Sequence, residues 1–107
     1  MVAVLGHRSG ASSPALPVTL TAPALADLLR IRAYIGQDNP AAANRVAVQI
    51  VAACDRLEYL PERGRPGLVP GTRELVALWP YVIVYRITPE EVQILRVWHG
   101  AQDRSGK

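Results

Sequence analysis

The sequence predicts a small α+β domain in which a helical hairpin packs on one face of an antiparallel sheet. Two segments between residues 21 and 60 repeat apolar residues at helical spacing, and they precede the strands rather than alternating with them. The runs at Tyr81–Ile87 and 92–98 are rich in β-branched residues and flank the polar turn TPEE, which is the pattern of a β-hairpin. A chain of 107 residues is long enough for one modest core and too short for two.

The first predicted elements are a short strand at Val18–Leu20 and a helix that begins after Thr21. Thr21 is a favoured N-cap residue, and Pro23 is acceptable in the first turn. The helix is expected to end at Gly36, before the turn signal DNP. Its residues divide into an apolar face and polar side chains that we expect to point elsewhere. The apolar face comprises Ala24, Leu28, Ile31 and Ile35, and the polar set comprises Asp27, Arg30 and Gln37.

Asn39 is placed to cap a second helix, which has Pro40 at its first position. This helix should stop near Leu60, because Pro61 disfavours helical geometry in the residue before it. The short break between the two helices predicts an antiparallel helical hairpin. The second helix carries a long apolar stripe, formed by Ala43, Val46, Ala47, Ile50, Cys54 and Leu57.

Glycine and proline residues make the segment 62–71 a predicted loop, which also contains Arg63 and Arg65. A strand at 73–79 follows, and the dipeptide WP turns the chain into the strand Tyr81–Ile87. On that strand, Tyr81 and Tyr85 alternate onto one face with apolar neighbours, so we expect them to pack in the core. The predicted order of elements is therefore β-α-α-β-β-β.

The rest of the composition limits the kinds of site that the chain can hold. We expect residues 1–17 to form a flexible lead-in, residues 18–104 a single domain, and residues 105–107 a tail. Cys54 is the only cysteine, so no intrachain disulfide can form, and a reducing cytoplasm is the expected location. One cysteine and two histidines without ligand spacing do not make a zinc site, and we expect no cofactor. No apolar run approaches the ~18 residues of a membrane span.

The charge of the chain is mildly basic and is carried almost entirely by arginine. Twelve basic side chains against nine acids give a formal net charge of +3, less than a dedicated duplex-binding domain shows. The planar guanidinium pairs in a bidentate manner with carboxylates or phosphates. An acidic protein partner therefore fits this composition as well as nucleic acid does.

Arg86, Arg96 and His99 lie within or at the ends of otherwise apolar strands, where charge is uncommon. Alternation places Arg96 on the face opposite Leu95 and Val97, which favours contact with a partner. Arg86 has a structural alternative, an ion pair with an acid of the adjoining turn. His99 is either a general acid or base, for which its near-neutral pKa would suit, or a strand-end histidine bonded to backbone.

Four further residues are candidates for contact with a target. Arg73 begins a strand after a glycine turn, and its alternative is a pair with Glu74 or Glu91. Arg63 and Arg65 are either contacts for nucleic acid or members of a solvated loop. Trp98, like Trp79, would anchor a partner side chain if it is exposed on the sheet.

The segments GTRELV at 71–76, YVIVYR at 81–86 and ILRVWHG at 94–100, in this order, resemble the RelE/ParE toxins of bacterial type II toxin–antitoxin modules. The resemblance covers residues 20–104. It implies a cytoplasmic protein that arrests growth unless an extended arm of a cognate antitoxin, which we expect to be acidic, masks the open face of its sheet. It also implies that operator DNA is bound only through the antitoxin.

RelE-type members of this superfamily cleave mRNA on the ribosome with a cluster of basic side chains. Their first basic strand residue is matched here by Arg73, but the second position holds Leu75, and the arginine of the next strand is replaced by Val82. After the final strand this chain offers His99, Gln102 and Arg104, and no tyrosine. The ribonuclease set is therefore largely missing.

ParE-type members inhibit DNA gyrase without such a cluster, and their closing strands carry an apolar residue at the Val82 position, then aromatic-Tyr-Arg, then Arg-Val-aliphatic-His. This chain follows that pattern, with Val84 and Trp98 as departures from it. The resemblance therefore implies a non-enzymatic, ParE-like gyrase inhibitor. Two alternatives stay open: a ribosome-dependent endoribonuclease that uses Arg73, Arg96 and His99, and a relative with only an interaction role. The residues expected to contact a target or the antitoxin are Arg63, Arg65, Arg73, Arg86, Arg96, Trp98 and His99.

Overall fold

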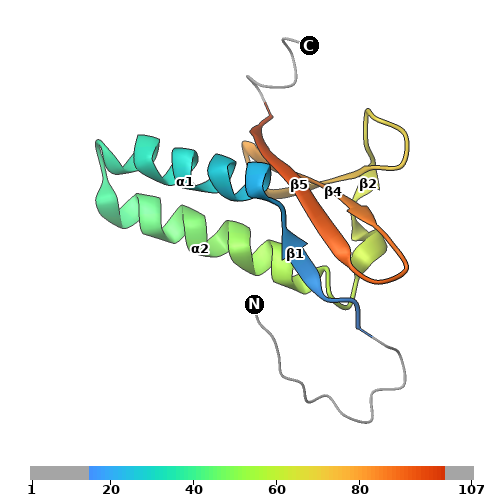
Figure 1. Ribbon diagram of the computed structural model, residues 1–107. Helices are drawn as coiled ribbons and strands as arrows, with labels where there is room; N and C mark the ends of the chain where they lie inside the picture. Colours follow the sequence, from blue (N-terminus) through green and yellow to red (C-terminus); the bar gives the residue numbers. More distant parts are fainter. Residues whose placement is uncertain (1–14, 101–107) are drawn as a thin grey trace.

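The computed structural model describes residues 15–100 (Figure 1). The predictions for Gln102, Arg104, the tail and most of the lead-in lie outside that range. Within it, the chain forms a helical layer packed on a sheet, so the predicted α+β class is confirmed. The elements are β1 (Val18–Leu20), α1 (Ala22–Gly36), α2 (Pro40–Arg56), the 3-10 turn η1 (Pro61–Arg63), β2 (Arg65–Pro66), β3 (Arg73–Leu78), β4 (Tyr81–Ile87) and β5 (Val92–His99).

The strands of the described range form one sheet in the order β1-β5-β4-β3-β2. Neighbouring strands are antiparallel except for β1, which runs parallel to β5 at one edge. A parallel pair needs a long crossover connection, and here the helical hairpin and three strands separate the two partners in sequence. The sheet is therefore mostly antiparallel, as predicted, with one parallel pair at its edge that the sequence pattern did not indicate.

The helical hairpin begins where the sequence predicts and ends earlier. Thr21 and Asn39 cap the two helices, and their side-chain oxygens accept hydrogen bonds from backbone N–H groups three residues ahead. The second helix ends at Arg56, four residues before the predicted end near Leu60. The chain turns there through tighter hydrogen bonds, such as that from the Leu57 N–H to the Cys54 carbonyl (3.0 Å), and Leu57 closes the core.

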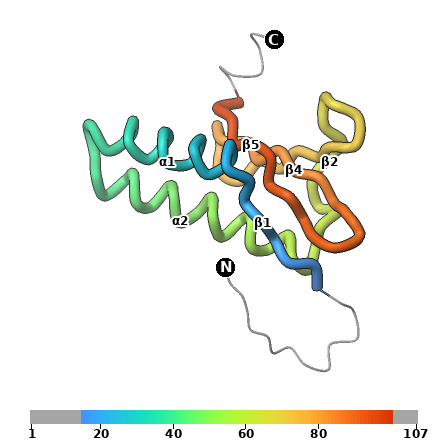
Figure 2. Tube along the Cα trace, viewed as in Figure 1, coloured from blue at the N-terminus to red at the C-terminus, as the bar shows by residue number. Residues whose placement is uncertain are grey.

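The helices pack side by side over one face of the sheet, α1 along β5 and α2 against β3 and β4 (Figure 2). The core between the layers contains most of the apolar stripes predicted for the helices, together with alternate residues of the three long strands. Its buried members are Ala24, Leu28, Ile50, Ala53, Cys54, Leu57, Ile83, Tyr85, Val92, Ile94 and Val97. Ile35, predicted on the first stripe, is half-buried and lies outside this core.

Three further local predictions are wrong. Asp27 is buried rather than on a polar face. Strand β2 lies inside the segment that was predicted to be a loop, where it pairs with the start of β3. Simple alternation fails at Leu95, because the pairing of β4 with β5 is irregular there: Tyr85 pairs with Ile94, and Val84 pairs with Arg96.

Candidate functional site

The face of the sheet that lies away from the helices, which we call the open face, carries most of the predicted contact residues. Its composition follows from the strand register, because residues directly opposite each other on neighbouring strands share a face. One row crosses four strands with a cation at each end, a second row is apolar, and a third lies beside the β4–β5 turn. The rows are Arg65-Glu74-Val84-Arg96, Val76-Val82-Trp98 and Arg86-Gln93.

The centre of the open face is apolar and one aromatic side chain projects beside it. Val82 and Val84 are buried, whereas Val76 is exposed and Trp98 is half-buried. Trp79, in the turn between β3 and β4, has 66% of its surface exposed. Its ring lies close to the Gly100 backbone, which also contacts the Val82 side chain. The accessible apolar side chains are therefore Val76, Trp79 and part of Trp98, and together with the nearby arginines they have the composition of a protein-binding surface.

Arg96 is held by a buried carboxylate that the sequence pattern assigned to a polar face. The Arg96 Nε and Nη2 atoms donate to the two oxygens of Asp27 at 2.7 and 3.0 Å, and Arg30 adds a third bond of 3.0 Å. The Val97 N–H also donates to Asp27, at 2.9 Å. Strand β1 ends at Leu20 and its pairing with β5 ends at Ile94, so the Val97 N–H of β5 has no strand partner there among residues 15–100. The Asp27 carboxylate supplies the acceptor that this N–H needs.

The charge state of Asp27 follows from these contacts. Burial by itself raises the pKa of the carboxyl, but the hydrogen bonds from Arg96, Val97 and Arg30 outweigh it, and the pKa lies below its usual value. The carboxylate is therefore ionised at neutral pH and holds the Arg96 guanidinium in place. The guanidinium carbon also lies 5.9 Å from the centroid of the Trp98 ring, within cation–π range.

Arg86 lies at the turn end of the open face, and its partner differs from the predicted one. Its Nε donates to Gln93 Oε1 at 2.8 Å rather than to an acid of the turn. Gln93 in turn donates to Glu91 at 2.6 Å, and the Thr19 hydroxyl donates to the same carboxylate at 2.7 Å. The guanidinium is exposed at the end of this chain of polar contacts, so it stays available to a partner.

Arg73 lies on the helix side of the sheet and binds backbone rather than the acids that were predicted as its partners. Its Nη1 donates to the carbonyls of Gly64 (2.7 Å) and Glu62 (3.3 Å). Opposite it, the buried Tyr85 hydroxyl donates to the Pro61 carbonyl (2.6 Å) and accepts from the Gly64 N–H (2.8 Å). The two side chains thus fix the path of the backbone between α2 and β2.

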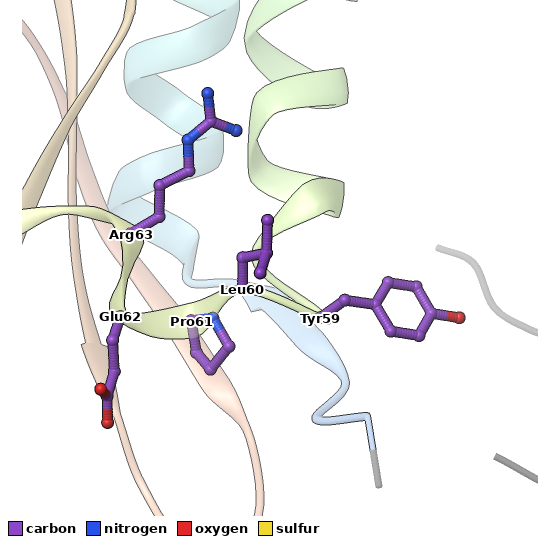
Figure 3. Close-up of a pocket in the computed structure, with 5 residues that line it drawn as sticks. All are labelled: Tyr59, Leu60, Pro61, Glu62 and Arg63. Carbon is purple, nitrogen blue, oxygen red and sulfur yellow. The ribbon is translucent and has the colours of Figure 1, made fainter. Parts of the chain in front are cut away.

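The two arginines of the predicted loop 62–71, Arg63 and Arg65, have different surroundings. Arg65 pairs with the buried carboxylate of Glu74 at 3.3 Å. Arg63 is exposed and borders an open hollow of about 510 Å³ with Tyr59 and Leu60 (Figure 3). In Figure 3 the side chains of Leu60 and Arg63 point to the same side of the backbone, and the side chain of Tyr59 points in a different direction from these two.

The structure does not bring Arg73, Arg96 and His99 together. Arg73 is opposite Tyr85 and His99 is opposite Tyr81, so the two are offset by four residues, about 13 Å, along the direction of β4. They also lie on strands at opposite sides of β4, which adds about 10 Å across the sheet. Arg96 pairs with Val84 on the other face and reaches toward α1. The His99 ring instead makes an edge-to-face contact with Tyr81, with ring centroids 5.6 Å apart.

Residues 15–100 contain no cluster of histidine, cysteine and acidic side chains that could hold a metal ion, and no helix in that range is long and apolar enough to cross a membrane. Cys54 is buried in the core, as predicted, and burial raises the pKa of its thiol to about 12. It is therefore a packing residue rather than a nucleophile.

Comparison with known proteins gives consistent matches to one superfamily. Residues 18–104 match the family model described as the ParE toxin of the type II toxin–antitoxin system parDE. Toxin RelE2 of Caulobacter vibrioides is 50% identical over 80 residues, which cover 74% of this chain and 89% of the relative. Putative toxin Y4kP of Sinorhizobium fredii is also 50% identical over 80 residues, covering 74% of this chain and 82% of the relative.

Two solved structures share the fold. The chromosomal ParDE toxin–antitoxin system of P. aeruginosa contains a chain that superposes with a TM-score of 0.75 and is 31% identical, covering 81% of this chain and 98% of that one. The toxin–antitoxin complex RelBE2 of Mycobacterium tuberculosis gives a TM-score of 0.58 at 29% identity, covering 83% of this chain and 94% of that one.

Proposed function

The chain belongs to the ParE toxin family of type II toxin–antitoxin systems, and from this premise we propose that it inhibits DNA gyrase and is neutralised by a cognate antitoxin. It is thus a toxin of the RelE/ParE superfamily. A gyrase inhibitor acts in the cytoplasm, which is also the expected location of a chain with one buried, reduced cysteine.

The packing of Val82 is the observation that carries the choice of target. This position holds an arginine in the ribonucleases of the superfamily, but here Val82 is fully buried in the central strand β4. Leu75, at the second missing basic position, packs against the core. Both positions thus hold apolar side chains that pack within the fold, which argues against a positive cluster that would stabilise charge on a phosphate during cleavage.

The other basic groups support the same conclusion. Arg73 is engaged by two backbone carbonyls, Arg96 is engaged by Asp27, and His99 packs on Tyr81. A general acid–base mechanism needs such groups within hydrogen-bond reach of one reacting centre. The strand register spreads them over two faces of the sheet, which favours binding over catalysis.

The open face has the properties that an antitoxin segment would need. Val76 and Trp79 are exposed on it, and guanidinium groups lie at both ends. The one acid within its three rows, Glu74, is buried and paired with Arg65, and Glu91 borders the face beside Gln93. An acidic, amphipathic segment is complementary to such a surface. The two solved relatives come from a ParDE system and a RelBE2 toxin–antitoxin complex, which supports an antitoxin as the partner of this chain.

The second candidate is a ribosome-dependent endoribonuclease, and one observation favours it: toxin RelE2, which is 50% identical over 80 residues, is named as a RelE toxin. That activity would require Arg73, Arg96 and His99 to converge on one phosphate. The register described above separates them, so we rank this function below gyrase inhibition.

A supercoiling assay with purified gyrase tests the proposal. We expect the purified chain to inhibit supercoiling, an equimolar amount of its antitoxin to restore it, and the exposed substitution Trp79→Ala to weaken one or both contacts. Unaffected supercoiling at a tenfold molar excess of folded protein would contradict gyrase as the target. Unimpaired growth of bacteria that express the chain alone would contradict both toxin activities and leave the interaction-only alternative.

A further inference from the structure

The loop between β2 and β3 exposes two adjacent large apolar side chains. Leu68 has 67% of its surface exposed and Val69 has 60%. The loop extends beyond the sheet, at the end of the molecule away from the turn between α1 and α2 (Figure 1). It therefore forms a convex, apolar tip.

Hydrogen bonds within the loop fix its shape. The Gly67 N–H donates to the Thr72 carbonyl (2.8 Å), and the Thr72 N–H and hydroxyl both donate to the Val69 carbonyl (3.1 and 2.6 Å). Pro70 follows Val69, and Gly71 has a φ of +87°, which together with the bond closing at Thr72 is the arrangement of a type II turn. The tip is thus ordered by its backbone and does not rely on its apolar side chains.

The base of the loop is anchored to the sheet and is basic. The buried Glu74 carboxylate accepts from the Leu68 N–H (3.4 Å) and from Arg65 (3.3 Å). Arg65 and Arg73 begin the two strands that support the loop. Glu74 offsets the charge of Arg65, whereas Arg73 donates to neutral backbone carbonyls and keeps its positive charge. The surroundings of the tip therefore favour an acidic partner.

Single exposed apolar residues are common and need no explanation. Here, however, two of them are adjacent on a preorganised loop whose fold does not use them, and binding residues are often found on such loops. A preorganised anchor loses little conformational entropy on binding, which increases affinity.

We propose that Leu68 and Val69 insert into an apolar recess with an acidic rim on the protein that this toxin inhibits. The inference rests on the proposed toxin function and adds a target contact outside the open face. A convex tip requires a concave partner surface, which a large folded protein offers and a single extended antitoxin segment does not. Nucleic acid is a poorer match, because the loop segment GLVPGT contains no aromatic residue for stacking on bases.

A matched pair of double variants tests the proposal. L68S/V69S removes the tip, and L29S/V48S makes the same substitutions at helix positions that are 53% and 66% exposed. Growth arrest on induction, at protein levels matched by immunoblot, is the readout, because it does not depend on which enzyme is inhibited. The affinity of each purified variant for the antitoxin is measured in parallel.

We expect L68S/V69S to need about tenfold more protein for the same arrest, which corresponds to about 1.4 kcal/mol of lost binding, with antitoxin affinity within about twofold of wild type. The helix variant should arrest growth like wild type. Equal toxicity of the loop variant, or a loss of antitoxin affinity in place of toxicity, would overturn the role of the loop. A wild type that arrests growth without inhibiting gyrase would contradict the gyrase assignment alone, because the comparison between variants still holds.

Charge at the tip tests the nature of the partner. Leu68→Glu should weaken arrest more than Leu68→Lys, because an acidic rim repels the first side chain and attracts the second. The opposite order would overturn the acidic partner. Binding of wild type to single-stranded RNA that is lost in L68S/V69S would assign the loop to nucleic acid and overturn the proposal.

Discussion

Substitution of Asp27 by alanine should be among the most damaging single changes in the described domain. Its carboxylate accepts four hydrogen bonds, two from Arg96 and one each from Arg30 and the Val97 N–H. Alanine leaves the Val97 N–H without its acceptor and Arg96 without its counter-ion. The contact between α1 and β5 is thereby weakened at the point where β1 no longer covers the edge of β5.

The size of the effect follows from the burial of each group. Breaking a buried ion pair by removing one partner costs about 3–5 kcal/mol, and an unsatisfied buried N–H alone costs about 1–3 kcal/mol. The Arg96 side chain is 43% exposed and recovers part of its hydration once it is released. We therefore expect Asp27→Ala to lower the free energy of unfolding by about 3 kcal/mol, toward the lower end of the range for buried pairs.

Urea denaturation at pH 7, followed by circular dichroism, measures this change. Asp55→Ala is the matched control, because Asp55 is exposed on α2 and should change stability by less than about 0.5 kcal/mol. A double-mutant cycle with Arg96→Met should show a coupling energy of at least about 1 kcal/mol between the two residues. A loss below about 1 kcal/mol for Asp27→Ala, or additive single effects, would refute the reasoning that Asp27 links the helix to the sheet.

Three further outcomes follow from the same structure. The pKa of Asp27 is lower in the folded protein than in the unfolded chain. Its contribution to the free energy of unfolding is therefore fully present above the unfolded pKa of about 3.9 and is lost as pH falls through the folded pKa. Asp27→Asn should accordingly make stability less dependent on pH at the acid end. Identical pH dependence of stability in the two proteins would contradict this. Tyr85→Phe removes the hydroxyl bridge between Pro61 and Gly64 and should cost about 1–3 kcal/mol in urea denaturation; a neutral result would mean that the bridge contributes nothing. Cys54, with a pKa of about 12, should resist a thiol reagent at pH 8 in the native protein and react on unfolding, whereas rapid native reaction would contradict its burial.

Much of the fold was predictable because local signals and burial agree. Thr21 and Asn39 cap the helices, and the strand Tyr81–Ile87 has the predicted bounds. The end of α2 was misplaced because proline marks only the last possible helical residue, whereas the burial of Leu57 sets the actual turn. Strand β2 was missed because two residues carry no periodic signal and pair only through tertiary contact.

The candidate site was less predictable, because sequence identifies charged residues but not their partners. Asp27 gave a signal that could have been used: it lies three residues after Ala24 and next to Leu28, on the apolar stripe of its helix. Its link to Arg96 joins residues 69 positions apart, which periodicity cannot show. The exposure of Trp79 and Leu68 likewise depends on how the finished sheet is covered.

A side-by-side assay of one preparation tests the central claim most directly. The purified chain is added to DNA gyrase with relaxed plasmid and, separately, to ribosomes translating a defined mRNA, each with and without the antitoxin. We predict inhibition of supercoiling that the antitoxin reverses, and intact mRNA. Cleaved mRNA on the ribosome with gyrase unaffected would contradict the account, because it would require catalytic groups that the strand register holds apart.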